Sequence, residues 1–196
     1  MRLGAVILAA GAGARLGGVA KALLRRGGET FLGRIARLAG EVGVAAPIVV
    51  VGPPHGDAVA AASRALGLVV IENPDPARGM ASSIALGFAA LPEGALDAAW
   101  LWPVDHPDVE IATLVRLRDA LGAHEVALPR WAGRGGHPPL ITRGLWSRLA
   151  DCAGLPAGAR SVLATADVIA VEVDDPGVVR DVDTPADLGA DLVEVS

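Results

Sequence analysis

A glycine-rich segment with two basic residues, from Gly11 to Lys21, is the part of this sequence best suited to holding phosphate groups. Small side chains let backbone N–H groups close around phosphate oxygens, and Arg15 and Lys21 supply the matching positive charge. The apolar run over residues 3–10 stops at Gly11, which predicts a buried strand that ends in a turn. The segment therefore predicts a polyphosphate site after the first strand. The alternative is a purely structural turn between a strand and a helix.

Two well-known phosphate loops do not match this segment. A Walker loop requires Gly-x-x-x-x-Gly-Lys followed by Ser or Thr, and neither Gly13 nor Gly17 has a lysine at the required place. A dinucleotide-binding loop requires a third glycine where this chain has Leu16. It also requires an acid for the ribose after the second strand, which here ends at Gly52 without one. Both of these kinds of nucleotide site are therefore disfavoured.

Two acidic residues far apart in the sequence are candidate ligands for a metal ion. Asp105 follows an apolar run, which predicts a place at the carboxyl end of a strand, where the first loop also lies. Asp183 precedes Thr184 and Pro185, which predict the start of a short helix. Carboxylate oxygens suit Mg²⁺, a hard cation that keeps several waters. The alternatives are a helix cap for Asp105, and surface carboxylates near a helix start for Asp181 and Asp183.

Strand-like and helix-like segments alternate along the chain. This alternation predicts a parallel sheet covered on both faces, because right-handed crossovers pack each helix against the sheet. The glycine- and proline-rich residues 130–139 interrupt the pattern, and they predict a loop or hairpin that reaches over the sheet. Strands are expected at residues 3–10, 48–51, 68–71, 98–102, 126–128 and 168–173, and helices at residues 31–42, 58–66, 82–91, 111–121 and 144–149.

Composition supports one α/β domain over residues 1–196 and argues against several classes of protein. Hydrophobic residues make up 52% of the chain and aromatic residues 3%, so Ala, Val, Leu and Ile are expected to form most of the core. The four tryptophans are expected to anchor the core or loops. A net charge of −5 argues against broad nucleic-acid binding. The single cysteine, Cys152, is expected to be a buried apolar residue of a cytoplasmic protein without a transmembrane helix.

The order of these motifs resembles the MobA-like NTP transferase family. The loop after the first strand is similar to the family signature Leu-Ala-Ala-Gly-x-Gly-x-Arg-hydrophobic-Gly, which a lysine follows. Residues 73–83 and 134–139 resemble segments of the molybdenum cofactor cytidylyltransferase (MocA-like) branch. The chain departs from that branch at Val104 and His106, and it lacks an acid shortly before Arg160. The resemblance implies a single-domain, three-layer α/β/α fold with a mostly parallel, Rossmann-like sheet of the nucleotide-diphospho-sugar transferase type.

The resemblance also implies roles for individual residues. Arg15, Lys21 and Asp105 are implied as catalytic residues, and Asp105 and Asp183 as ligands of Mg²⁺. Arg134 and His137 are implied on the acceptor side, where His137 either binds an acceptor phosphate or only fixes its loop. The implied nucleotide-binding residues are Leu8, Ala9, Ala10, Gly11, Ala12, Gly13, Arg15, Gly17, Lys21, Asn73, Gly79, Ser82 and Ser83. One of the two serines can equally serve as a helix cap.

The implied reaction transfers a nucleotide from a nucleoside triphosphate, with CTP favoured, to a phosphorylated small molecule, with molybdopterin favoured, and releases pyrophosphate. An acceptor phosphate attacks directly, while the metal and Lys21 neutralise the growing charge. The alternatives are a sugar- or alcohol-phosphate acceptor, a non-catalytic cofactor-binding or delivery protein of the same fold, and, more distantly, a dehydrogenase. Transient contact with a molybdoenzyme or its maturation factor is a further expectation, whereas neither nucleic acid nor a membrane is expected as a partner.

Overall fold

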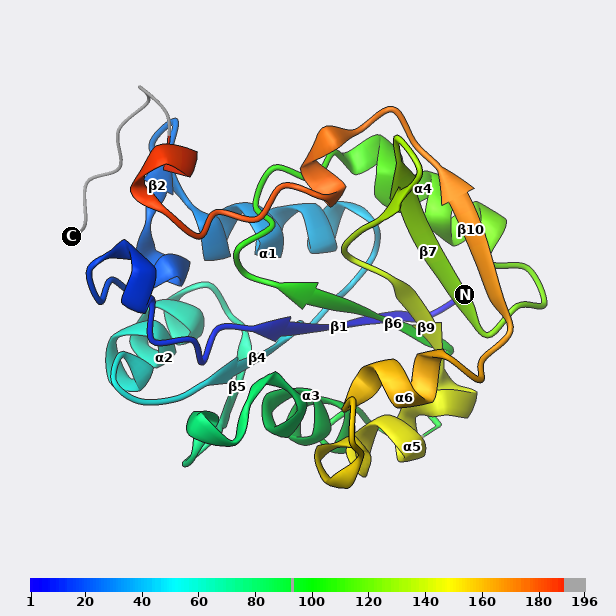
Figure 1. The fold of residues 1–196 in the computed structure, drawn as a ribbon, viewed down its shortest axis with the longest axis horizontal. Coiled ribbons are helices and arrows are strands. Elements are labelled where there is room, and N and C mark those ends of the chain that lie inside the picture. Colours follow the sequence, from blue (N-terminus) through cyan, green and yellow to red (C-terminus); the bar gives the residue numbers. More distant parts are fainter. Residues whose placement is uncertain (93, 189–196) are drawn as a thin grey trace.

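A mostly parallel sheet runs through the middle of the molecule (Figure 1). The structure, a computed structural model, describes residues 1–92 and 94–188. The strands along the sheet follow the order β10-β7-β9-β6-β1-β4-β5, and β8 pairs with β7 beside this path. Their bounds are β1 Leu3–Leu8, β4 Ile48–Val51, β5 Val69–Glu72, β6 Ala98–Pro103, β7 Val126–Trp131, β8 Arg134–Gly135, β9 Leu140–Thr142 and β10 Val168–Glu172. A separate hairpin pairs β2 Arg25–Arg26 with β3 Glu29–Thr30.

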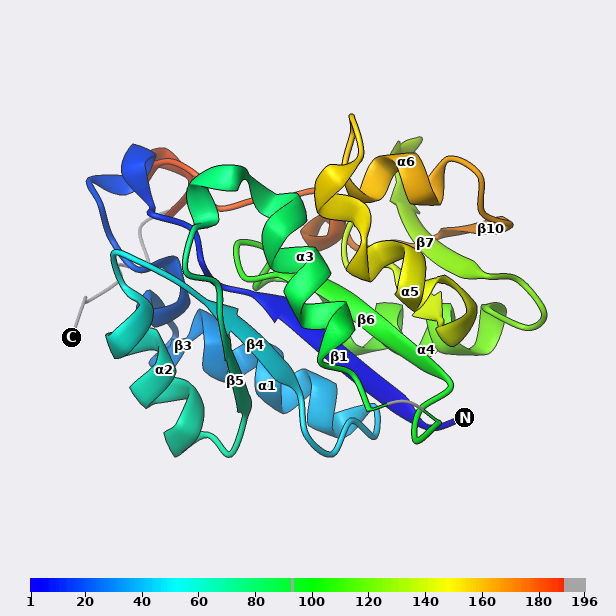
Figure 2. The same ribbon diagram turned by 90° about the horizontal axis from the view of Figure 1, so that it is seen from below.

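Helices cover both faces of the sheet (Figures 1 and 2). Their bounds are α1 Phe31–Glu41, α2 Gly56–Ala65, α3 Met80–Ala89, α4 Ile111–Ala120, α5 Trp146–Ala150 and α6 Ala159–Leu163. Side chains of β1 alternate between the faces, and both faces are apolar. Ala5 and Ile7 pack in one cluster with residues of α1, α2 and α4, whereas Val6 and Leu8 pack in another with residues of α3, α5 and α6. The predicted three-layer α/β/α fold is confirmed.

The sheet is mixed where residues 130–139 were expected to reach over it. β7 and β8 do form a hairpin, with Trp131 paired to Arg134. The chain then turns back as β9, which inserts antiparallel between β6 and β7. Sequence reasoning missed β9, because a run of only three residues behind two prolines gives no periodic signal. Of the predicted loop or hairpin, the hairpin is observed, but it continues the sheet beside β7 instead of reaching over it, and the strand that follows was not predicted.

The other predicted strands and helices each overlap an observed element, with differences of a few residues at their ends. Residues 144–149, expected as one helix, begin as a single 3₁₀ turn, Arg143–Leu145, that leads into α5. Sequence reasoning also missed α6, which is five residues long and follows Gly158. Such a short helix owes its stability to packing, here of Val162 in the apolar cluster of α3 and α5, rather than to its own sequence.

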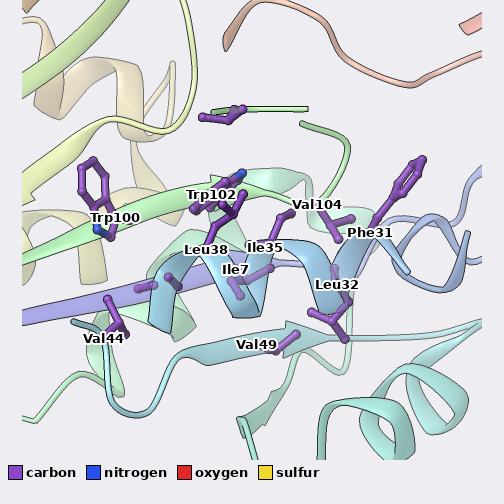
Figure 3. Close-up of a cluster of buried hydrophobic side chains, with 14 of the residues drawn as sticks. Ile7, Phe31, Leu32, Ile35, Leu38, Val44, Val49, Trp100, Trp102 and Val104 are labelled. Atoms are coloured by element: carbon purple, nitrogen blue, oxygen red, sulfur yellow. The ribbon is translucent and has the colours of Figure 1, made fainter. Parts of the chain in front are cut away.

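Large side chains from neighbouring elements fill the core on the α1 side of the sheet (Figure 3). Trp100 and Trp102 of β6 are completely buried there, and Trp146 is buried on the opposite side. These tryptophans are core anchors, as predicted. Cys152 is buried in the cluster of α3 and α5, and burial raises the pKa of its thiol, so its predicted role as a small apolar residue is confirmed.

Two adjacent central strands end at the same edge of the sheet. β1 and β6 are parallel and in register from Leu3 opposite Ala98 to Leu8 opposite Pro103. The pairing continues past the strands, because the N–H of Val104 donates to the carbonyl of Leu8 over 3.1 Å. The loop after β1 and the turn after β6 therefore start side by side. Among the described residues, no helix is both long and apolar enough to cross a bilayer.

Candidate active site

A cavity of about 370 Å³ opens where β1 and β6 end. Its walls are the loop after β1, the start of α3, the turn after β6 and the segment near the C-terminal end of the described chain. Most of the predicted site residues line it: Leu8, Ala9, Ala10, Gly11, Ala12, Gly13, Arg15, Lys21, Gly79, Ser83, Asp105 and Asp183. The predicted site residues that do not line the cavity are Gly17, Asn73, Ser82, Arg134 and His137.

The loop after β1 turns sharply at Gly13, whose φ is +60°. A Cβ atom at this position would lie 1.9 Å from the carbonyl oxygen of Val19, so only glycine fits. The N–H groups of Leu16 and Gly18 both donate to the carbonyl of Gly13, over 2.9 and 3.0 Å. Gly17 has a φ of +78° and shapes this turn from outside the cavity wall. The glycines thus hold Arg15 on a short 3₁₀ turn at the mouth of the cavity.

Four charged side chains from three separate regions meet in the cavity. The Nζ atom of Lys21 lies 3.3 Å from Oδ2 of Asp105 and also donates to Oδ1 of Asp183. Nη1 of Arg15 lies 2.6 Å from Oδ2 of Asp183. The hydrogen bond from Lys21, followed by the charges of Lys21 and Arg15, holds the pKa of the Asp183 carboxyl below its usual value. The sequence predicted each of these residues separately, and the fold brings them together.

Asp183 reaches the cavity because the chain after β10 runs back to the turn that follows β6. The N–H of Val182 donates to the carbonyl of Asp105 over 2.8 Å, which sets the two acidic residues beside each other. The predicted helix start is a 3₁₀ helix, Pro185–Leu188, and the carboxylate of Asp187 accepts from the N–H and hydroxyl of Thr184. The spacing Thr-x-x-Asp matches one half of a capping box, in which the acid accepts from the N–H at the helix start, and this signal could have identified Asp187. Asp181 is exposed and lies outside the cavity wall.

Asp105 and Asp183 fit the donor set that a divalent cation such as Mg²⁺ requires. Their carboxylates converge on one ammonium group, so both can approach one point in the cavity. Among the described residues there is no group of three or more His, Cys, Asp or Glu side chains that could enclose a metal. Mg²⁺ typically uses one or two carboxylates together with water and substrate phosphates. The pair therefore suits a cation that binds together with a phosphorylated substrate.

The Asn73 side chain lies behind the wall formed by the start of α3. Its Nδ2 donates to Oγ of Ser82 and to Oγ of Ser83, over 2.8 and 2.9 Å, and Asn73 and both serines are buried. The hydroxyl of Ser82 in turn donates to the carbonyl of Gly79. Of the three polar side chains, Ser83 alone lines the cavity. Asn73 and Ser82 thus support the wall that Ser83 and Gly79 form.

Arg134 lies on the hairpin that precedes β9, and His137 lies between that hairpin and β9. Arg134 is exposed, whereas the His137 ring packs against the ring of His106 with 4.9 Å between their centroids. Burial, and then the neighbouring His106, lower the pKa of His137 to about 4, so its imidazole is neutral at pH 7. The backbone N–H of His137 donates to the carbonyl of Val178 over 2.7 Å. These contacts favour the expectation that His137 fixes its loop over the expectation that it binds phosphate as a cation.

The family model described as MobA-like NTP transferase domain matches residues 5–171 of this chain. Nicotine blue oxidoreductase from Paenarthrobacter nicotinovorans is 31% identical over 188 residues, which cover 91% of this chain and 91% of that protein. The bifunctional IPC transferase and DIPP synthase of Rubrobacter xylanophilus is 42% identical over 95 residues, which cover 46% of this chain. This chain spans only 22% of the length of that relative.

Solved structures similar to this chain include Rv0371c from Mycobacterium tuberculosis H37Rv. The two chains are 30% identical, with a TM-score of 0.78 over 98% of this chain and 97% of the other. A structure of Rv0371c in complex with manganese is also similar, with 28% identity and a TM-score of 0.71 over 95% of this chain and 96% of the other. The similarity therefore extends over nearly the whole of both chains.

Proposed function

The chain belongs to the MobA-like NTP transferase family, and we propose that it transfers CMP from CTP to a phosphorylated acceptor and releases pyrophosphate. The observation that carries this proposal is the meeting of Arg15, Lys21, Asp105 and Asp183 in one cavity, beside a glycine-rich loop. Two cationic side chains suit a triphosphate, and two carboxylates suit the divalent cation that accompanies it. The likeness to Rv0371c, of which a structure with manganese exists, supports the use of a divalent cation.

The chemistry requires charge neutralisation more than a protein nucleophile. An oxygen of the acceptor phosphate attacks the α-phosphorus, the bond from that phosphorus to the bridging oxygen of the β-phosphate breaks, and pyrophosphate leaves. Lys21 would lie over the α-phosphate, and Arg15 with the N–H groups of residues 12–15, which line the cavity, would bind the β- and γ-phosphates. Asp105 and Asp183 would hold Mg²⁺, which supplies positive charge to the phosphate oxygens when bound.

Binding of the triphosphate rearranges the ion pairs of the cavity. Arg15 and Lys21 both contact Asp183, so a triphosphate that binds these cations competes with that carboxylate for them. The Arg15 side chain is 76% exposed and can turn toward a ligand at little cost. Once released, the carboxylates of Asp183 and Asp105 become available to a divalent cation. The two ligands are therefore expected to bind cooperatively.

Molybdopterin is the acceptor that we propose, because residues 73–83 and 134–139 resemble segments of the molybdenum cofactor cytidylyltransferase (MocA-like) branch of this family. The exposed guanidinium of Arg134 would face the phosphate of this acceptor. A sugar phosphate or an alcohol phosphate is the alternative acceptor, and a non-catalytic delivery protein is the alternative to an enzyme. A molybdopterin product would be passed on to a molybdoenzyme or its maturation factor.

The direct test supplies the purified protein with Mg²⁺, CTP or GTP, and molybdopterin, and measures pyrophosphate and the dinucleotide product. The proposal predicts a cytidine dinucleotide and an equal amount of pyrophosphate. Turnover of a sugar phosphate but not of the pterin would overturn the acceptor and leave nucleotidyl transfer in place. Tight binding of triphosphate and pterin without any pyrophosphate would favour the delivery protein instead.

A second candidate function is oxidation or reduction with a nicotinamide cofactor. The 31% identity to nicotine blue oxidoreductase over 91% of both chains favours it. In that case Arg15 and Lys21 would bind the phosphates of the dinucleotide. A thermal-shift measurement separates the two functions, because a ligand that binds only the folded state raises Tm. CTP with Mg²⁺ should raise Tm of this protein, and NADH or NADPH should not. The reverse result would favour the oxidoreductase.

A further inference from the structure

We infer that Trp102 is a positioning residue, which fixes the turn that carries Asp105 and thereby sets the affinity of the site for a divalent cation. The inference rests on the proposed function, because it concerns the carboxylate pair of the same site. Trp102 is completely buried and does not line the cavity, so it acts only through the residues that it holds.

The turn after β6 is short and is closed by a bond from its own backbone. The N–H of His106 donates to the carbonyl of Pro103 over 3.2 Å, with Val104 and Asp105 between them. The Nε1–H of Trp102 donates to the carbonyl of His106 over 3.0 Å, inside the protein. A side chain at the end of the strand therefore holds the far end of the turn, and this bond limits how Asp105 can swing relative to β6.

A second bond holds the same turn from a distant part of the chain. The carbonyl of Asp105 accepts the N–H of Val182 over 2.8 Å, and Asp183 follows directly. Two consecutive carbonyl groups, those of Asp105 and His106, thus accept hydrogen bonds from two different regions of the chain. Breaking either bond frees one side of the turn and allows the distance between the two carboxylates to vary. Loss of a bond that orients a metal ligand typically weakens metal binding by roughly 10- to 100-fold.

Trp100 provides a matched control within the same strand. It is also completely buried, and it packs in the same apolar cluster beside α1 (Figure 3). Its Nε1 atom, however, is buried without a hydrogen-bond partner in the described part of the chain. Replacing either tryptophan by phenylalanine removes the same atoms from the core. Only the replacement of Trp102 removes a bond to the Asp105 turn.

The test measures binding of Mn²⁺ to the wild type, Trp102→Phe and Trp100→Phe, by titration of the free aqua ion in electron paramagnetic resonance, together with Tm. We expect Trp102→Phe to weaken Mn²⁺ binding about tenfold and Trp100→Phe to change it less than about twofold. Both substitutions should lower Tm. Equal affinities in Trp102→Phe and the wild type, or equal losses in the two variants, would overturn the role of Trp102. A wild type that binds no Mn²⁺ would instead overturn the metal site, and this inference with it.

A measurement on the wild type keeps the inference testable if Trp102→Phe does not fold. Indole N–H signals of ¹⁵N-tryptophan protein can be followed by NMR while Mg²⁺ and CTP are added, with Trp100→Phe, Trp131→Phe and Trp146→Phe to assign the four signals. The Trp102 signal should shift on saturation and its N–H should exchange slowly with solvent, while the Trp100 signal should stay in place. A Trp102 signal that does not respond when the ligands are bound would overturn the inference.

Discussion

Nη1 of Arg15 lies 2.6 Å from Oδ2 of Asp183, although the two residues are 168 positions apart in the sequence. The contact joins the loop after the first strand to the segment near the C-terminal end of the described chain, across the mouth of the cavity. It also pairs a residue proposed to bind phosphate with a residue proposed to bind metal. The triphosphate and the divalent cation therefore each compete with this ion pair. A substitution of Arg15 or Asp183 should change the affinity for the other residue's ligand.

Asp105→Asn and Asp183→Asn should each lower turnover at least about a hundredfold, because an amide does not supply the negative charge that the cation needs. Tm and the circular dichroism spectrum should remain close to those of the wild type. Asp181→Asn is the matched control, since Asp181 is exposed outside the cavity, and it should retain activity. Near-normal turnover in either of the first two variants would remove that residue from the metal site.

Arg15→Ala should weaken binding of CTP, whereas Lys21→Ala should lower the rate of the chemical step more than binding. The reason is that only Lys21 is assigned to the α-phosphate, where the charge changes in the transition state. Calorimetric binding and single-turnover rates at saturating CTP separate these effects. Arg116→Ala, at an exposed position on α4, serves as the control. If Lys21→Ala bound CTP poorly but reacted normally once saturated, the two roles would be exchanged.

Arg15→Ala should also tighten the binding of Mn²⁺ in the absence of nucleotide, by up to about fivefold. This follows because an exposed ion pair is worth roughly 0.2–1 kcal/mol and the cation competes with Arg15 for Asp183. Arg78→Ala removes a positive charge beside the cavity without touching Asp183, and it is expected to have a smaller effect. Equal effects of both substitutions would show that the total positive charge near the cavity, rather than the contact between Arg15 and Asp183, determines metal affinity.

His137 should make the protein less stable as the pH falls from about 6.5 toward 4. Its folded pKa, about 4, lies below the value near 6.5 expected for the unfolded chain, so the unfolded state takes up the proton first. Above that window both states are neutral and the group has no effect. Tm measured from pH 7 to pH 4 should therefore fall less steeply in His137→Gln.

Arg134→Ala should impair use of the acceptor and leave CTP binding unchanged, because Arg134 is exposed and lies outside the cavity. The Michaelis constant for the acceptor is expected to rise about tenfold, which corresponds to the loss of one charge-assisted hydrogen bond. The control is Arg148→Ala, whose side chain on α5 bonds to Thr165. An unchanged constant for every acceptor tested would place the acceptor phosphate elsewhere.

The sequence by itself determined the loop after β1, the central strands and the identity of the four charged residues. These features are local, since a run of apolar residues that stops at a glycine predicts both the buried strand and the turn after it. The parallel arrangement follows from the alternation of strands and helices, and it places strand ends at one edge. For the same reason the amino-acid sequence alone predicts that Arg15, Lys21 and Asp105 lie near one another.

Tertiary structure decided what depends on contacts between distant segments. No local signal shows that Val182 bonds to Asp105, and this bond brings Asp183 beside Asp105 in the cavity. Asn73 was expected to touch the nucleotide, but packing turns its amide toward two serines. The insertion of β9 between β6 and β7 likewise depends on which strand edges meet, because three residues are too few to specify their own pairing.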